Sequence, residues 1–168
     1  MGQQQLLLLV LGVVLVGLAV VVGISAFGEN QKKNNLDLIT NDAVRLAAGV
    51  QAWKMRPNAQ GGGQSDTNYS RFSFAQLGIT PAGTGQNATY STSSGTFRIK
   101  PYLVTGQIAQ YAQAQYGITT TGNAVAVIGL SKDATQSVMI VMFASDPSKM
   151  VTILQHPFNV DAYNAPPL

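Results

Sequence analysis

The sequence predicts an α+β fold, in which one long N-terminal α-helix, apolar and then amphipathic, packs on a small antiparallel β-sheet head. Three observations favour it. Residues 6–24 form an unbroken apolar run, an amphipathic stripe at helical spacing follows, and three apolar, β-branched runs separated by short turns lie between 124 and 155. We therefore divide the 168 residues into an apolar helix (1–28), an amphipathic helix (29–56) and a globular head (57–168) with Gly/Ser/Thr-rich loops.

The apolar run from Leu6 to Ile24 is long enough to cross a membrane. Its 19 residues include no polar side chain, and no charged side chain occurs before Glu29. As a helix the run would be about 28 Å long, close to the thickness of a bilayer's hydrocarbon core. A helix satisfies its own backbone hydrogen bonds in lipid, which a lone strand does not. Hydropathy alone therefore favours a single membrane-spanning or signal-anchor helix.

The flanks of the apolar run argue against a cleaved secretory signal. The stretch MGQQQ has no basic residue, the run is longer than the apolar part of an ordinary signal, and its end has no clear small-x-small cleavage site. Lys32 and Lys33 follow the run. If Met1 is the initiator, the positive-inside rule places the head in the cytoplasm. If a basic leader precedes Met1 and is removed, the orientation reverses.

An amphipathic stripe continues the helix to about residue 56. Its apolar positions are three or four residues apart, as on one face of a helix. Pro57 disfavours helical backbone at the residue before it, so we expect the helix to end near Arg56. The stripe, which we expect to pack on the head, consists of Leu36, Ile39, Ala43, Leu46, Val50 and Trp53.

The strongest strand pattern lies near the C-terminus, in the runs Ala124–Leu130, Ser137–Ala144 and Met150–Gln155. The short spacers between these runs predict an antiparallel meander. The middle run is apolar on both faces and is therefore expected to be covered twice. Strand alternation places Val138, Ile140 and Met142 on one face and Met139, Val141 and Phe143 on the other.

The rest of the head gives weaker patterns. Thr96–Lys100 reads as a strand that Pro101 ends, and Phe72, Phe74 and Leu77 suggest a short strand. A short helix is expected around residues 108–115. Residues 58–70 and 81–95 are turn-like, and the tail 157–168 is expected to be extended.

Composition excludes several classes of function. Charged residues make up 10% of the chain and the net charge is +3, too small and dispersed to indicate nucleic acid or anionic lipid as the main partner. Lys54, Arg56 and Arg71 form only a loose basic group, so no specific nucleic-acid partner is predicted. The chain has no cysteine, and its one histidine has no second histidine or glutamate near it in the sequence.

No catalytic pattern emerges, and we expect neither enzyme activity nor a cofactor or metal. Glu29 is the only glutamate, Asp37 and Asp42 are placed on the helix exterior, and Asp133 and Asp146 fall in turns, where aspartate is common. The triple glycine 61–63 lacks the Lys-Ser/Thr of a phosphate-binding loop.

A short polar start, some twenty apolar residues and an amphipathic continuation into a β-rich head together resemble a type IV pilin or its pseudopilin relatives. The likeness covers residues 1–56 and extends to the head only by class. It implies removal of a leader peptide before Met1, methylation there, and packing of the apolar helices as a filament core. The family usually has glutamate at the fifth position, where this chain has the uncharged Gln5.

The resemblance implies partners and assembly positions. The partners would be further copies in a helical homopolymer, the inner membrane before assembly, and the pilus assembly machinery, with an extracellular filament as the final location. Gly12 and Gly17 are not spaced as GxxxG, but glycines weaken the helix and permit close approach. The candidate assembly residues are Gln5, Leu6, Leu9, Gly12, Gly17 and Gly23.

Two alternatives remain open beside the pilus subunit. One is a pseudopilin of a type II secretion-like machine, and the other is a single-span, signal-anchored protein whose head binds a partner. Two sequons and one hydroxyl-rich run also mark candidate glycosylation sites in expected surface loops. These are Asn68, Asn87, Ser91, Thr92, Ser93 and Ser94.

Overall fold

The computed structural model describes residues 2–66, 69, 71–84, 88–103, 123–144, 146 and 148–154, with backbone alone for 101–103 and 123. Contacts divide the chain into two units, Met1–Asn34 and Asn35–Leu168. The expected α+β class is confirmed, since a 54-residue N-terminal helix packs against a five-stranded antiparallel sheet.

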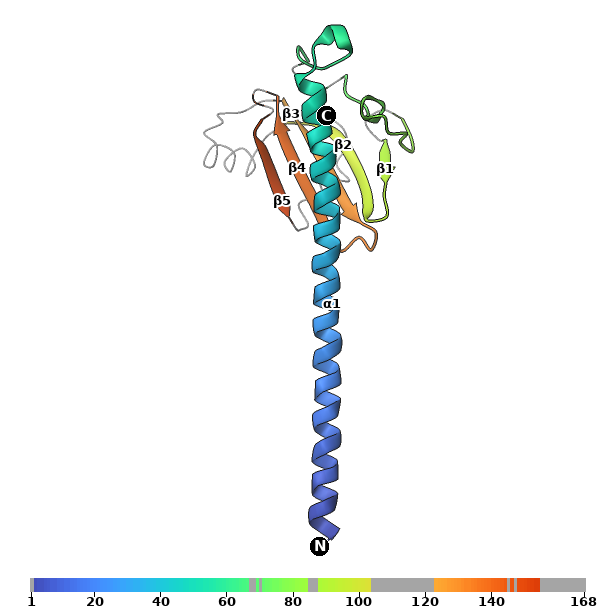
Figure 1. Ribbon diagram of the computed structural model, residues 1–168, viewed down its shortest axis with the longest axis vertical. Helices are drawn as coiled ribbons and strands as arrows, with labels where there is room; N and C mark the ends of the chain where they lie inside the picture. Colours follow the sequence, from blue (N-terminus) through green and yellow to red (C-terminus); the bar gives the residue numbers. More distant parts are fainter. Residues whose placement is uncertain are drawn as a thin grey trace. The chain divides into compact units, whose positions relative to one another are not determined.

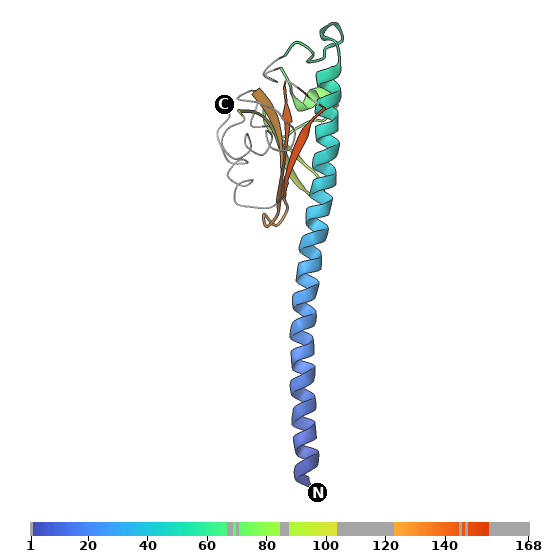
Figure 2. The same cartoon turned by 90° about the vertical axis from the view of Figure 1, so that its left-hand side faces the viewer.

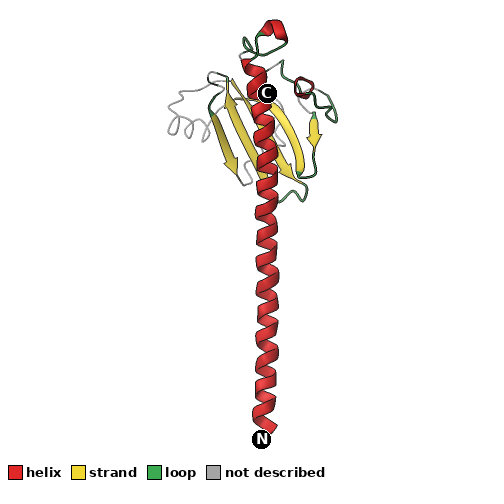
Figure 3. Cartoon of the chain, in the orientation of Figure 1, coloured by secondary structure: helices red, strands yellow, loops and turns green. Residues whose placement is uncertain are grey.

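The helix α1 spans Gly2–Met55 (Figure 3). Its end agrees with the stop expected from Pro57, whose ring fixes φ and whose nitrogen donates no hydrogen bond. Short 3₁₀ turns follow at Asn58–Gln60 (η1) and Phe74–Leu77 (η2). The expectation of a short strand around Phe74 is therefore wrong. Gly78 adopts a left-handed conformation with φ of 70°, and its N–H bonds back to Ala75, which closes a turn.

The sheet is a meander in the order β1-β2-β3-β4-β5, with every neighbouring pair antiparallel (Figure 1). This confirms the meander expected from the short turns between the last three strands. The strands are β1 (Thr89–Ser91), β2 (Gly95–Leu103), β3 (Asn123–Ser131), β4 (Ser137–Phe143) and β5 (Met150–Leu154). The expected short helix around 108–115 and the tail from Pro157 lie outside the described residues.

The sequence suggested that the strand would stop before Pro101. In the structure, strand β2 continues beyond it. Pro101 is paired with Val125 of β3, and the strand continues to Leu103. Strand β1 covers the other edge of β2 only from Thr96 to Arg98. Pro101 lies beyond that stretch, and a residue without an N–H is tolerated where one edge of a strand has no ladder to complete.

Strand β4 is buried along its whole length, so the expectation that it is covered on both faces is confirmed. One face, with Val138, Ile140 and Met142, belongs to the core that also contains the buried stripe of α1. The other, with Met139, Val141 and Phe143, belongs to a second cluster. Figures 1 and 2 show the C-terminal part of α1 lying along the first of these faces.

Candidate assembly surface

The N-terminal part of α1 carries an apolar surface that nothing in the described structure covers. Between Leu6 and Ile24 the leucine, valine and isoleucine side chains are 51% to 70% exposed. Helix α1 is long and apolar enough to cross a membrane, and none of its most apolar 18 residues is buried. Exposing so much apolar area to water is unfavourable, so lipid or other protein chains must cover it.

The candidate assembly residues Gln5, Leu6 and Leu9 lie on this surface, and all three are exposed. Met1 lies outside the described residues. The helix is unbroken through Gly12, Gly17 and Gly23, and a Cβ added at any of these glycines would meet no atom within 4 Å. In a single chain these glycines therefore expose backbone on the helix surface instead of accommodating a neighbour.

Within the head, the amphipathic stripe is the buried face of α1. The stripe and one face of the sheet form a core, and Leu36 is partly buried against that core. The remaining five residues are at most 5% exposed, and they are Ile39, Ala43, Leu46, Val50 and Trp53. Away from this stripe, Leu38 and Val44 of the same turns are 47% and 45% exposed. The helix therefore presents one apolar stripe to the sheet and separate apolar side chains to the outside.

The loop after α1 is anchored on the Trp53 indole, which is 2% exposed. Trp53 Nε1 donates a hydrogen bond to the Gly61 carbonyl (3.1 Å), and its ring meets that of Phe72 edge-on with centroids 5.1 Å apart. Gly62 and Gly63 approach α1 so closely that a Cβ would lie 2.1 Å from the Arg56 carbonyl oxygen and 2.3 Å from the Trp53 ring, respectively. The triple glycine thus lies in a tight turn, as its turn-like pattern predicted, but the sequence did not reveal its close packing on α1.

Lys54 is a buried cation beside this loop. Its Nζ donates hydrogen bonds to the carbonyls of Gly63 (3.0 Å) and Asp66, and it lies 5.4 Å from the centroid of the Tyr69 ring. Burial lowers the pKa of Lys54, and the nearby Asp66 charge opposes that shift. The loose basic group suggested by the sequence is therefore not a surface patch, because Lys54 is internal while Arg56 and Arg71 are exposed.

Asp42 is half-buried and tied to the β1–β2 turn, a correction to its expected place on the helix exterior. Its Oδ2 accepts hydrogen bonds from the hydroxyls of Thr92 (3.0 Å) and Ser94. These two candidate glycosylation sites therefore have hydroxyls bonded to Asp42. Ser91 and Ser93 are exposed, and the Ser91 hydroxyl pairs with that of Thr96 (3.4 Å). Asn68 and Asn87 lie outside the described residues. In the sequence, the one sign that Asp42 is half-buried was its position next to Ala43 of the predicted stripe.

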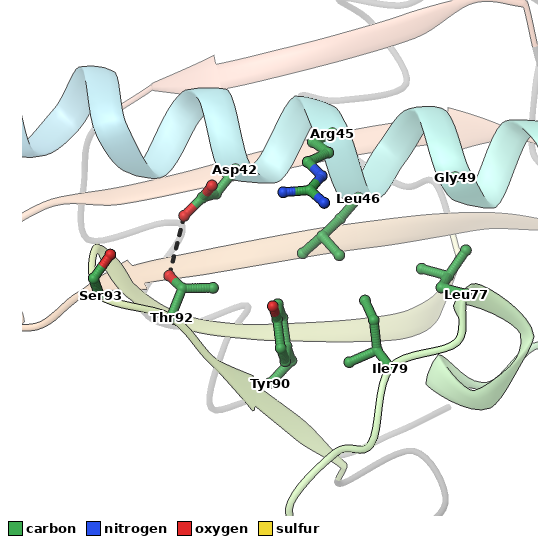
Figure 4. Close-up of a pocket in the computed structure, with 9 residues that line it drawn as sticks. All are labelled: Asp42, Arg45, Leu46, Gly49, Leu77, Ile79, Tyr90, Thr92 and Ser93. Atoms are coloured by element: carbon green, nitrogen blue, oxygen red, sulfur yellow. Dashed lines mark hydrogen bonds between the residues drawn. The ribbon is translucent and has the colours of Figure 1, made fainter.

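A groove opens beside Asp42, between α1 and the segments that precede and follow β1 (Figure 4). Its volume is about 460 Å³. We call it the Arg45 groove, and its lining residues are Asp42, Arg45, Leu46, Gly49, Leu77, Ile79, Tyr90, Thr92 and Ser93. Figure 4 shows the Arg45 side chain reaching toward the groove from the helix, with Leu77, Ile79 and Tyr90 on the opposite wall.

Two other acidic side chains in the described part of the head, Asp133 and Asp146, serve turns. Asp133 accepts bonds from the Ser131 hydroxyl, the Thr135 hydroxyl (2.8 Å) and the Thr135 N–H (3.2 Å), and the two hydroxyl bonds lower its pKa. Asp146 is bonded by the Ser148 hydroxyl, which lowers its pKa, and is paired with Lys149 (3.5 Å). Both aspartates lie in turns, as expected. Among the described residues, no group of three His, Cys, Asp or Glu side chains could hold a metal ion.

Comparison of the chain with protein-family models, curated proteins and solved structures gives no match. The architecture itself is pilin-like, because a long N-terminal helix that begins as an exposed apolar segment packs farther along on an antiparallel sheet. That likeness rests on the arrangement of elements alone.

Proposed function

We propose that this chain is a structural, non-enzymatic subunit of an extracellular filament of the type IV pilus kind. One observation carries the proposal. The same helix that supplies the core of the head also presents the exposed apolar surface from Leu6 to Ile24. In a filament, equivalent surfaces of neighbouring copies would cover one another, while the heads would form the outside.

The hydrophobic effect is large enough to hold such a filament together. Keeping the 15 leucine, valine and isoleucine side chains of residues 6–24 from water contributes roughly 1.5–3 kcal/mol each, or tens of kcal/mol per subunit before entropic costs. In this account the inner membrane holds the helix before assembly and the assembly machinery transfers it. The apolar surface then passes from lipid to protein without meeting water.

A pseudopilin would use the same surface in a short periplasmic rod, and a single-span anchor would leave it in lipid. Electron microscopy of material sheared from the cell surface separates the three, because only the pilus subunit gives long filaments made mainly of this chain. The chain of a pseudopilin would be absent from sheared material at native expression, and a simple anchor would stay in the membrane fraction.

The processing step has its own test. We expect the mature protein to begin at Met1, with codons for a short basic leader immediately upstream in the gene. N-terminal sequencing of the sheared protein, read against those codons, checks both points. An initiator methionine at position 1 that remains in the membrane protein would contradict the pilin assignment and favour the anchor.

A further inference from the structure

The Arg45 groove combines partly exposed apolar side chains with a charged one, as a protein-binding surface does. Leu77, Ile79 and Tyr90 line its wall and remain only partly buried against the head core. Apolar side chains left half-exposed beside a charge are suited to a partner that is both apolar and charged.

Arg45 supplies that charge. The neighbouring Asp42 accepts the hydroxyls of Thr92 and Ser94. Arg45 is exposed and, within the described part of the chain, makes no ion pair or side-chain hydrogen bond. A guanidinium in this position is suited to a carboxylate, which it can bind with two parallel hydrogen bonds.

The complementary pair lies on the same helix. Asp37 and Leu38 are adjacent and exposed on α1, and among the described residues Asp37 has no ion pair or side-chain hydrogen bond. Leu38 is 47% exposed although the next residue, Ile39, is fully buried. Together they offer an acidic group beside an apolar one.

This pair cannot reach the groove of its own chain. Asp37 and Arg45 are eight positions apart on one continuous helix, which separates them by about 12 Å along its axis. If this pair fills the groove, it must therefore come from another copy of the chain.

We propose that the Arg45 groove receives the Asp37–Leu38 face of α1 from a second copy of this chain. Asp37 of one subunit pairs with Arg45 of the next, and Leu38 covers the apolar wall formed by Leu77 and Ile79. The contact staggers parallel helices by about 12 Å, which is eight residues. This inference rests on the proposed filament function and assigns its subunit register.

The geometry of the contact favours an open polymer. The donating face and the receiving groove are different parts of the surface, so the contact is heterologous. A heterologous contact that does not close into a ring repeats without limit along a helical axis. One end of the growing polymer always keeps a free Asp37–Leu38 face and the other end a free groove, so a further copy can add.

Cysteine cross-linking in filaments tests the contact, because the natural chain has no cysteine. Oxidation of filaments of the double variant Asp37→Cys/Arg45→Cys should give a ladder of multimers on a non-reducing gel. An intrachain disulfide is excluded, since bridged Cα atoms lie no more than about 7 Å apart. Each single variant, and the matched pair Asp37→Cys/Met55→Cys with its second cysteine outside the groove, should give no ladder.

Charge reversal gives an independent test. Asp37→Arg and Arg45→Asp should each lower filament yield by about tenfold or more, because like charges held at an interface repel strongly. The double reversal Asp37→Arg/Arg45→Asp should restore most of the yield. A merely local effect, such as repulsion between Asp42 and the carboxylate introduced by Arg45→Asp, would not be rescued by a change at position 37.

The outcomes separate this inference from the function beneath it. Filaments that form normally but give no ladder, with a double reversal no better than the single variants, overturn the Arg45 contact and leave the filament function standing. If the unmodified chain forms no filament at all, the proposed function fails, and the contact fails with it.

Discussion

Gly63 lies against the indole ring of Trp53, with its N–H bonded to the Trp53 carbonyl oxygen at 3.0 Å. The loop after the helix end thus folds back on the residue that closes the buried stripe. Only a hydrogen atom fits between the Gly63 α-carbon and the ring, since a Cβ would lie 2.3 Å from it.

The variant Gly63→Ala should therefore destabilise the head. Forcing a methyl group into a packed site costs about 1–3 kcal/mol. Chemical unfolding of the full chain in detergent, followed by Trp53 fluorescence, measures the loss. The matched control is Gly28→Ala, where an added Cβ meets no atom within 4 Å. Equal stability of Gly63→Ala and the natural chain would contradict the packing of the loop on Trp53.

Substitutions at two neighbouring helix residues should affect head stability and filament assembly separately. Ile39→Ala removes a fully buried side chain and should cost about 2–5 kcal/mol of unfolding free energy. Leu38→Ala shortens a side chain that is 47% exposed, so it should leave head stability nearly unchanged while lowering filament yield. Unfolding curves and yields of sheared filaments measure the two effects. A Leu38→Ala variant that unfolds as readily as Ile39→Ala would show that both side chains belong to the core.

Tyr69 should make stability fall at high pH. Its hydroxyl donates to the Phe143 carbonyl (3.3 Å), and burial, reinforced by the Asp66 charge, raises its pKa well above the ordinary value. In the unfolded chain the phenol ionises near pH 10, so the unfolded state loses protons first and the unfolding free energy falls above about pH 10.

Tyr69→Phe should cost about 1 kcal/mol at pH 7 through the lost hydrogen bond. The gap between the two proteins should narrow as the pH rises above about 10, because only the natural chain has this phenol to ionise. Phenylalanine keeps an aromatic ring beside Lys54, so the variant retains the contact between the cation and the ring. Unfolding free energies measured from pH 7 to about pH 11 check the trend. A constant gap over that range would mean that the Tyr69 phenol titrates alike in both states.

Periodicity in the sequence predicted the helix and strands that bury one or both faces. It could not predict features that depend on contacts between separate elements. The spacing from Leu36 to Trp53 predicted the helix stripe, and the unbroken apolarity of β4 predicted its burial on both sides. The role of Gly63 depends on Trp53 packing from another element, which no local pattern records. Pro101 was expected to end its strand because it has no N–H to donate. It is tolerated in β2 because β1 does not extend to it.

The candidate surfaces divide in the same way. The run from Leu6 to Ile24 could be recognised from its sequence, since 19 residues without a polar side chain leave the helix no polar face. The Arg45 groove could not be predicted, because its walls come from segments far apart in the sequence, around Arg45 on α1 and around Ile79 and Tyr90 in the head. Likewise, the attachment of Asp42 to Thr92 and Ser94 joins residues 50 and 52 positions apart.

The amide of Gln5 would lie among apolar helices in a filament, where a neutral group costs far less to bury than an unpaired carboxylate. Gln5→Glu should be tolerated only if a positive amine lies within reach, and Gln5→Leu should cost little only if no polar partner exists. Filament yield from the two variants distinguishes these environments. Equal yield from both would remove any special role for this position.

A density map of filaments sheared from the cell surface, resolved to the backbone, measures assembly most directly. We predict long filaments made mainly of this chain, with residues 6–24 of neighbouring copies packed together inside and the helix locally unwound between Gly12 and Gly23. Glycine's high backbone freedom makes that stretch the weakest part of the helix, and an opened backbone that lipid would not tolerate is tolerated where neighbouring helices surround it. Continuous helical density from Gln5 through Phe27 would refute the unwinding alone. A chain found only as a monomer or small oligomer in the membrane fraction, or a filament with residues 6–24 on its outside, would contradict the assembly role itself.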